Sequence, residues 1–485
     1  MNLLQPIIVL LAFIPVAVSL STANGETVQH GSPPPNIVFI LCDNLGYGDV
    51  GCFGSKLHRT PHIDQLAAEG LKLTSFYSAS GVCTPSRAAL MTGCYPPRVG
   101  LHLTDPDGAV LRPVSPNGLH PDEVTIAELL KSADYTTACI GKWHLGDQPV
   151  FLPTRQGFDQ FFGIPYSDDM TPREGQPWPP LPLPLMCQET VIEAPVDRDL
   201  LTRRYTEEAV KFIQQNKDRP FFLYLPHAMP GSTAHPFAGD AFKGRSANGP
   251  WGDSVEELDW STGQILKTLK DLNLDERTIV VWTSDNGVPQ RKPPQGSNLP
   301  LSGWGYSTME GGMRVPCIVR WSSHIPAGTV SDELTTMMDW LPTLTSLAKT
   351  HLPADRPIDG RDINELLIDP TETKSPHDEF LYYYRDQLQA IRDSRWKLHL
   401  ARDDRQVSLT GKTQSSPAQI YDLKADIGEQ HNVASQHPDI VERLTMQAAN
   451  AVRELGDTAK PGISQRPVGR SEQPVPQVLR EPGGN

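Results

Sequence analysis

The chain has 485 residues, of which 57 are acidic and 43 basic, and its formal net charge is −14 with neutral histidines. This acidity argues against nucleic acid as a partner, because a general nucleic-acid binder needs basic side chains that replace phosphate counterions. Hydrophobic residues make up 38% of the chain. The chain also has 46 prolines and 38 glycines, which fall between the apolar segments. The composition therefore predicts one large folded domain, or two, with long shaped loops over a rigid scaffold.

The seven cysteines include no C-x-x-C pair and no Cys/His cluster at zinc spacing. This pattern argues against a structural zinc site and against thioredoxin-like redox chemistry. Disulfide pairing stays open.

An apolar stretch over residues 6–20 opens the chain. It has the length of a signal-peptide h-region and is too short to span a hydrocarbon core of ~30 Å. Small residues follow it, with a cleavage site after Ala23. We therefore expect residues 1–23 to be a cleaved signal peptide, and a secreted or periplasmic protein with no stable membrane anchor. The alternative is a short anchor, because no Lys or Arg precedes the apolar stretch.

Apolar strands alternate with helical segments through the first 350 residues. The first strand, over 36–42, is apolar without alternation, as in a strand that is buried on both faces. The elements expected after it are a helix between Thr60 and Gly70, a strand over 71–77, a helix over 125–132, a strand over 136–140, a helix over 200–217, a strand over 221–225, a helix over 251–272 and a strand over 278–283. This order predicts an α/β fold, a mostly parallel sheet with helices on both faces.

The pattern changes near residue 350. Short antiparallel strands are expected over 380–384, 388–392 and 396–400, followed by an amphipathic helix over 440–455. The expected organisation is a large domain over 34–350, a smaller C-terminal α+β domain over 351–456 with a short antiparallel sheet, and a disordered tail over 457–485.

Polar side chains follow four of the expected strands. They are Asp43 and Asn44, Lys142 and His144, His227, and Asp285 and Asn286. In open α/β sheets, ligands bind outside the carboxyl ends of the strands. A single polar residue at a strand end is weak evidence, because such residues end strands in many proteins. Two acid–amide pairs together with a Lys/His pair favour a functional site.

Cys83 precedes Thr-Pro-Ser-Arg and a run of helix formers, which places it at or near a helix N-terminus. There the helix dipole lowers a thiol pKa, although an isolated free cysteine is more often buried and inert. Residues 83–87, Cys-Thr-Pro-Ser-Arg, resemble the C-x-P-S-R motif of the type I sulfatases. In that family the cysteine is oxidised to formylglycine before folding is complete.

Further segments resemble the same family in the same order along the chain. They are residues 43–49, 141–146, 158–167 (similar to the arylsulfatase A-like branch), 284–287, 310–316 and 421–433. The resemblance covers nearly the whole chain after the expected signal peptide. It implies an alkaline phosphatase-like fold, with residues 34–350 as the catalytic domain.

The resemblance implies a divalent cation, calcium or magnesium, held by Asp43, Asn44, Asp285 and Asn286. A hard cation with oxygen ligands would place positive charge on the nonbridging oxygens of a sulfate ester. The resemblance also implies a formylglycine-generating enzyme as a partner that converts Cys83.

The resemblance assigns the remaining site residues roles in sulfate ester hydrolysis. A hydrated aldehyde at residue 83 offers one hydroxyl that attacks sulfur and a second whose collapse expels sulfate. The implied roles are proton acceptor for Asp285, stabilisation of the nucleophile for Arg87 and Lys142, assistance in the collapse for His144, and sulfate contact for Ser167.

Two positions depart from the family pattern. Gly305 stands where the family carries a lysine that contacts sulfate and the leaving-group oxygen, and Gly231 stands where it carries a histidine. The leaving-group acid therefore stays open among His227, His235 and Lys292. We expect His227 to take the role, because it directly follows an expected strand.

The predicted function is that of an exported sulfatase acting on a sulfated sugar, a polysaccharide or an aryl sulfate. Two alternatives stay open: a phosphate or phosphonate ester hydrolase of the same superfamily, and a catalytically silent carbohydrate-binding relative. The intact motif at Cys83 argues against a silent relative, whereas Gly305 and Gly231 keep it open. The sugar, the sulfate position, endo or exo action and the oligomeric state are not predicted.

Overall fold

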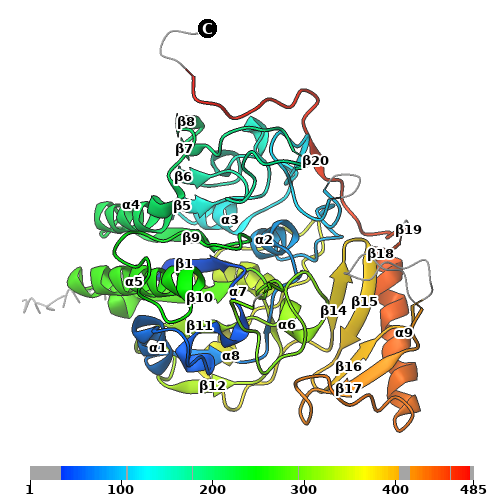
Figure 1. Ribbon diagram of the computed structural model, residues 1–485. Helices are drawn as coiled ribbons and strands as arrows, with labels where there is room; N and C mark the ends of the chain where they lie inside the picture. The colour runs from blue at the N-terminus through cyan, green and yellow to red at the C-terminus, as the bar shows by residue number, and fades with distance from the viewer. Residues whose placement is uncertain are drawn as a thin grey trace, which may run out of the picture. The chain divides into compact units, whose positions relative to one another are not determined.

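A ten-stranded sheet organises the computed structural model (Figure 1). The structure describes residues 34–104, 108–176, 178–292, 294–402, 415–458 and 460–480. The expected signal peptide over residues 1–23 lies outside the described residues. Across the sheet the strands are β12 (Thr329–Ser331), β2 (Leu71–Leu73), β11 (Cys317–Arg320), β10 (Thr278–Ser284), β1 (Asn36–Asp43), β9 (Phe221–Pro230), β5 (Thr136–Lys142), β6 (Gln160–Ile164), β7 (Leu185–Cys187) and β8 (Thr190–Glu193).

The central strands of this sheet are parallel, from β10 through β1, β9 and β5 to β6. Antiparallel strands β11 and β7 flank them, so the mostly parallel sheet predicted from the sequence is confirmed. Strand β1 is buried along its whole length, as its uninterrupted apolar sequence predicts. Because these central strands run the same way, their carboxyl ends meet at one edge of the sheet.

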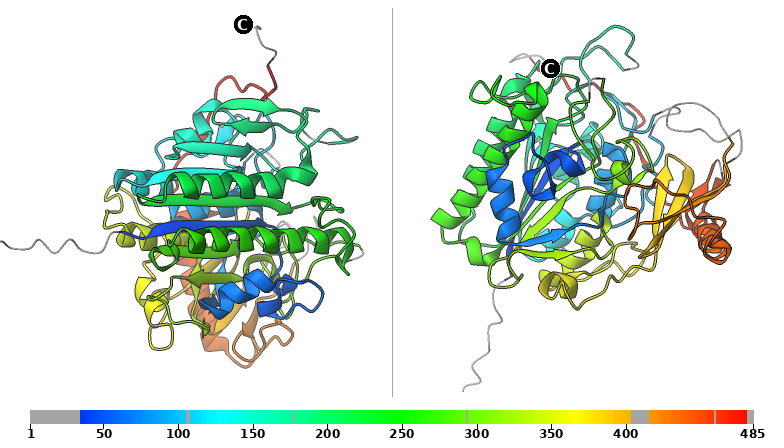
Figure 2. Two further views of the ribbon diagram at one scale, coloured as in Figure 1. Left: turned by 90° about the vertical axis from the view of Figure 1, so that its left-hand side faces the viewer. Right: turned by 60° about the horizontal axis from the view of Figure 1, so that its bottom comes forward.

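Helices cover both faces of the sheet and produce two cores. One face, turned toward the viewer in Figure 2 (left), carries α1 (Pro61–Ala68), α4 (Leu201–Gln215) and α5 (Gly249–Asp271). The other face carries α2 (Cys83–Thr92), α3 (Ile126–Ser132), α7 (Trp340–Leu347) and α8 (Asn364–Ile368). Successive side chains of β1 enter opposite cores: Val38 packs with the first group of helices, and Phe39 lies edge-on to Trp340, with ring centroids 5.8 Å apart.

The strand expected over residues 71–77 divides in two. Strand β2 pairs with β11 and β12 in the large sheet, whereas β3 (Phe76–Tyr77) pairs with β13 (Thr335–Thr336) in a separate two-stranded sheet. Single-turn helices occupy the loops; they are η1 (Tyr47–Asp49), η2 (Gly51–Phe53), η3 (Pro149–Phe151), η4 (Pro153–Arg155), η5 (Arg198–Leu200), η6 (Asp275–Arg277), η7 (Met337–Asp339) and the α-helical turn α6 (Glu310–Met313).

An antiparallel four-stranded sheet and a long helix form the C-terminal part, on the side of the large sheet that carries α2 and α7 (Figure 1). The strands and the helix are β14 (Phe380–Tyr384), β15 (Gln387–Arg392), β16 (Trp396–His399), β17 (Gln419–Asp422) and α9 (Pro438–Leu455). Leu444 and Leu455 of α9 share a core with Ile391 and Leu398 of the sheet. The small antiparallel sheet predicted from the sequence is therefore confirmed.

A buried charge network joins the large and the small sheet. Glu310 of α6 accepts hydrogen bonds from Tyr382 at 2.7 Å and from Lys397 at 3.0 Å, both from the C-terminal sheet. Lys397 also lies 3.0 Å from Glu429, which accepts the main-chain N–H of Glu310 at 2.9 Å. These bonds fix the loop that precedes α6, and this loop contributes to the site described below.

The chain beyond α9 crosses back over the large domain (Figure 1). Composition predicts disorder for it, yet residues 460–480 make defined contacts. After a short hairpin of β18 (Gly456–Asp457) and β19 (Lys460–Pro461), β20 (Gly469–Arg470) pairs with β4 (Asn117–Gly118). Arg466 binds both carboxylate oxygens of Glu123, at 2.6 and 2.8 Å. Main-chain pairing and this ion pair order a segment whose apolar content is low.

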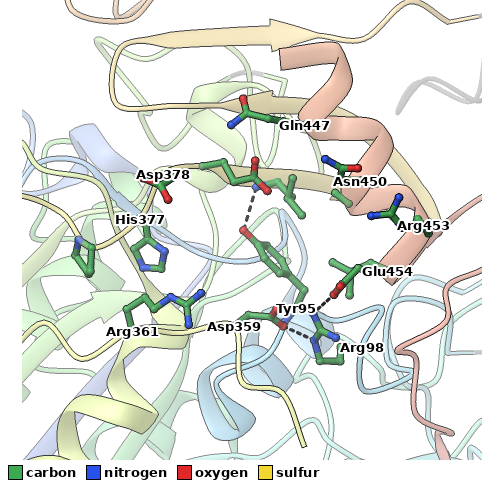
Figure 3. Close-up of a pocket in the computed structure, with 15 residues that line it drawn as sticks. Tyr95, Arg98, Asp359, Arg361, His377, Asp378, Gln447, Asn450, Arg453 and Glu454 are labelled. Atoms are coloured by element: carbon green, nitrogen blue, oxygen red, sulfur yellow. Dashed lines mark hydrogen bonds and ion pairs between the residues drawn. The ribbon is translucent and has the colours of Figure 1, made fainter. Parts of the chain in front are cut away.

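A polar cavity of about 490 Å³ lies between α9 and the segments around Tyr95 and Asp359 (Figure 3). Arg98 forms two bonds of 2.7 Å to the carboxylate of Asp359, which also accepts the main-chain N–H of Tyr95 at 2.9 Å. Only 4% of Arg98 is exposed. The Arg98–Asp359 pair is therefore a buried ion pair that ties the segments around this cavity together.

We expect Asp359→Ala to destabilise the protein by about 3 kcal/mol, because the buried Arg98 charge then keeps only the more distant carboxylate of Glu454, at 3.5 Å. Urea unfolding and thermal melting measure this loss. Asp355→Ala removes an exposed pair with Arg356 and is the control, in which little change is expected. Equal stability of the two variants would contradict this role of Asp359.

Candidate active site

Side chains from three separated elements converge at the carboxyl edge of the sheet. Strand β1 ends at Asp43, and Asp285 directly follows β10. Arg87 of α2 lies between them: its Nη2 is 2.9 Å from Asp43 Oδ1 and 2.8 Å from Asp285 Oδ2. All three side chains are completely buried. The sequence prediction that strand ends bring these groups together is therefore consistent with the structure.

Lys142 at the end of β5 extends this cluster. Its Nζ lies 2.6 Å from Asp43 Oδ1 and donates to Ser167 Oγ at 3.1 Å, and its main-chain oxygen accepts a bond of 2.7 Å from Arg87. Burial opposes its charge, but Asp43 raises the pKa of Lys142 above its usual range. Lys142 therefore stays cationic and links Ser167 to the carboxylates.

The two carboxyl groups of the cluster differ in acidity. Burial raises the pKa of both, but Lys142 and Arg87 together hold the pKa of Asp43 well below its usual range. Burial and repulsion from Asp43 raise the pKa of Asp285 to about 7. Asp43 is thus the stronger acid of the two carboxyl groups.

Cys83 is the first residue of α2, as the sequence predicts, and only 4% of it is exposed. Its Sγ and one carboxylate oxygen each of Asp43 and Asp285 lie within 4.8 Å of one another. Burial, followed by repulsion from Asp43, raises the pKa of the Cys83 thiol well above its usual value. The expectation that the helix dipole lowers this pKa is therefore wrong, because burial and the neighbouring carboxylates dominate.

Two asparagines surround the carboxylates with amide groups. Asn44 donates its main-chain N–H to Asp285 Oδ1 at 3.0 Å and its Nδ2–H to Asp43 Oδ2 at 3.2 Å. Asn286 donates to Asn44 Oδ1 at 2.6 Å, but its own Oδ1 is buried with no hydrogen-bond partner among the described residues. Carboxylate and amide oxygens are the ligands of hard divalent cations, so these four side chains fit such an ion.

His144 lies beside the cluster as a neutral ring. Burial, and then the charges of Lys142 and Arg87, lower its pKa well below the usual value. Its Nε2 lies 3.0 Å from the main-chain oxygen of Leu111, so this nitrogen carries the proton. Its Nδ1 is buried without a partner in the described part of the chain and is a free proton acceptor.

His227 is placed differently from the sequence expectation. Its Nε2 lies 3.2 Å from Ser261 Oγ on α5, and its ring centroid is 6.3 Å from that of Tyr205 on α4. Burial lowers the pKa of His227 to about 3. A neutral imidazole packed among α4 and α5 does not fit the role of leaving-group acid that we expected for it.

The other two candidates for the acid lie on the surface. Both His235 and Lys292 are exposed. Among the described residues, no contact of either side chain connects it to the cluster around Asp43. The geometry therefore supports neither as the leaving-group acid.

The backbone around the two glycines that depart from the family pattern explains why no larger residue stands there. Gly231 has φ +76°, and its N–H donates to the main-chain oxygen of Asp43 at 3.0 Å. A Cβ on Gly305 would lie 2.2 Å from the main-chain oxygen of Gly287. A lysine or histidine at these positions would require the backbone to move.

Sequence reasoning missed three polar side chains at the site, namely Asp168, Ser232 and Tyr306. Asn44 Nδ2 donates to Ser232 Oγ at 2.9 Å, and Ser232 Oγ lies 2.9 Å from Tyr306 Oη. A signal was present: Ser232 and Tyr306 directly follow the two unusual glycines, and Asp168 directly follows Ser167.

Comparisons with known proteins agree with this arrangement. The family model "Sulfatase" matches residues 35–350, and "C-terminal region of aryl-sulfatase" matches residues 375–475. Arylsulfatase A of Homo sapiens is 38% identical over 509 residues, covering 97% of this chain and 96% of that protein. N-acetylgalactosamine-6-sulfatase of Canis lupus familiaris is 40% identical over 384 residues, covering 76% and 72%.

A solved sulfatase structure from Pseudoalteromonas sp. superposes with a TM-score of 0.75 at 29% identity, covering 87% of this chain and 90% of that one. The first family match alone spans more than half of the chain, and its residues include the whole cluster from Asp43 to Asp285. The chain therefore belongs to the sulfatase family, whose members hydrolyse sulfate esters.

Proposed function

We propose that this protein is an exported sulfatase that hydrolyses the sulfate esters of a sugar or polysaccharide, with formylglycine at residue 83 and a bound calcium or magnesium ion. The observation that carries the proposal is the placement of Cys83 within 4.8 Å of the carboxylates of Asp43 and Asp285. The name of the N-acetylgalactosamine-6-sulfatase relative supports a sugar sulfate. Export rests on the apolar stretch over residues 6–20.

Asp43, Asn44, Asp285 and Asn286 would hold the cation. When bound, calcium or magnesium supplies positive charge to the nonbridging oxygens of sulfate. The buried Asn286 Oδ1, which has no partner among the described residues, supports this assignment, because a ligated cation would satisfy it. Asn44 makes the ligand set less negative than a second aspartate would.

A bound cation would add positive charge to a site that already contains two cationic side chains. The charges of Arg87 and Lys142 already face the carboxylates of Asp43 and Asp285. With a net charge of −14 on the whole chain, long-range attraction for a sulfate ester is absent. Local charge from Arg87, Lys142 and a bound cation would therefore attract an anionic substrate.

The chain's own residues then act on the bound ester. As a formylglycine hydrate, residue 83 supplies the attacking hydroxyl. Asp285 accepts the proton of that hydroxyl, while Arg87, which lies 2.8 Å from Asp285 Oδ2, stabilises the developing negative charge of the hydroxyl oxygen. Lys142 Nζ and Ser167 Oγ, 3.1 Å apart, orient the sulfate oxygens. The free Nδ1 of His144 accepts the proton whose removal releases sulfate.

Cys83→Ser, produced in the same host, is expected to lose nearly all multiple turnover of nitrophenyl sulfate, because serine has one hydroxyl and cannot form an aldehyde. The control is Cys187→Ser, which changes an exposed free cysteine and should leave turnover intact. Wild-type turnover by Cys83→Ser would refute this mechanism. Faster hydrolysis of nitrophenyl phosphate than of nitrophenyl sulfate would favour the phosphate ester hydrolase.

Elemental analysis is expected to find about one calcium or magnesium ion per chain. Adding calcium to chelated protein should raise the melting temperature, by a stabilisation of about 2.7 kcal/mol at a hundredfold excess over the dissociation constant. Asn44→Asp should tighten calcium binding in calorimetry, since it adds a carboxylate. Stoichiometric zinc, or full activity of Asp43→Ala combined with Asp285→Ala after chelation, would contradict this cation site.

A further inference from the structure

The Asp168 carboxyl group is completely buried, and both of its oxygens lack a hydrogen-bond partner among the described residues. In the described part of the chain, Arg198 Nη1 donates a hydrogen bond of 3.1 Å to the main-chain oxygen of Asp168. A buried carboxyl group without partners is costly, and native proteins rarely retain one for stability alone. A role in the fold therefore does not explain this side chain.

Asp168 is placed at the candidate active site. It directly follows Ser167, whose Oγ accepts from Lys142 at 3.1 Å. On its other side, Asp168 Oδ1 would lie 2.9 Å from a Cβ built on Gly231, whose N–H donates to Asp43 at 3.0 Å. The carboxyl group thus occupies the space that a side chain at residue 231 would need, beside the strand end that carries Asp43.

Asp168 is a protonated acid at neutral pH. Burial is the main cause that raises its pKa to about 8. The charged and titratable groups that face it are Asp169 and Asp43, which raise its pKa, Lys142 and Arg198, which lower it, and the Tyr205 hydroxyl. The net effect is a carboxylic acid that donates a proton below about pH 8.

The other buried titratable groups nearby are poorer donors. The pKa of His227 is lowered to about 3 and that of His144 lies well below its usual value, so both rings are neutral. Burial raises the pKa of the Tyr306 hydroxyl well above its usual value, which makes it a weak acid. A departing alkoxide needs a proton, whereas a phenolate largely does not.

We propose that Asp168 donates the proton that the leaving alcohol requires. This role rests on the proposed sulfatase function. As the bond from the residue 83 oxygen to sulfur forms, the bond from sulfur to the leaving oxygen breaks. The leaving oxygen keeps the electron pair, takes the proton of Asp168 and departs as an alcohol. Asp168 is left as a carboxylate and regains a proton from water.

The test compares two substrates in Asp168→Asn. We expect kcat/KM to fall about 10²-fold or more for a monosaccharide sulfate and less than tenfold for nitrophenyl sulfate. Asp169→Asn, which changes the neighbouring carboxylate, should keep the wild-type ratio of the two substrates. Tyr306→Phe removes a competing hydroxyl of the site and should also leave that ratio unchanged.

The pH profile supplies a second readout. Because the pKa of folded Asp168 is raised to about 8, its acid form is present below that pH and is lost as the pH rises through it. Wild-type turnover of the sugar sulfate should therefore decline above about pH 8, and this decline should be absent in Asp168→Asn.

A leaving-group series on the wild-type protein needs no variant. The rate should depend weakly on leaving-group pKa below about pH 8 and steeply above it. A steep dependence at every pH would overturn the assignment, as would equal losses of Asp168→Asn on both substrates, no loss, or a selective loss in Tyr306→Phe. A wild-type protein that hydrolyses neither sulfate would refute the proposed function itself.

Discussion

The buried guanidinium of Arg87 is the contact on which the site depends. It lies between two carboxylates, 2.9 Å from Asp43 and 2.8 Å from Asp285, in a region closed to solvent. Without it, the ends of β1 and β10 would bring two like charges together in low dielectric. Because Arg87 belongs to α2, the same bonds fix the start of that helix, and with it Cys83, against the edge of the sheet.

The arrangement separates two tasks that an ester hydrolase must perform. In the proposed function, the charged groups around Asp43 and Lys142 bind the anionic part of a substrate, whereas the uncharged acid Asp168 and the Ser232–Tyr306 pair lie on the side of the two unusual glycines. A site that lacks a lysine at Gly305 has less positive charge for a departing oxygen. We infer that proton donation by the buried Asp168 carboxyl group takes the place of that charge. The absence of a lysine at Gly305 and of a histidine at Gly231 is then explained by one proton donor.

The local sequence predicts much of this architecture. The uninterrupted apolar run of β1 and the alternation with helices predict the parallel sheet, and the sheet alone brings Asp43, Lys142 and Asp285 to one edge. The local sequence does not predict the directions of the side chains beyond the strand ends. The pairing of β1 with β9 shifts register between Leu41 and Asp43, and β9 continues to Pro230, so His227 enters the core beside α5. Such shifts depend on tertiary packing, which also orders the tail through Arg466.

The most direct measurement of the central claim is mass spectrometry of the Cys83 peptide together with sulfate release by the same preparation. Protein from hosts with and without a formylglycine-generating enzyme will differ in the fraction of Cys83 that is converted to formylglycine. We expect the maximal turnover rate to rise in proportion to the fraction of peptide that carries the aldehyde, and to vanish when only the thiol is found. Undiminished turnover by protein whose residue 83 is entirely thiol would contradict the account.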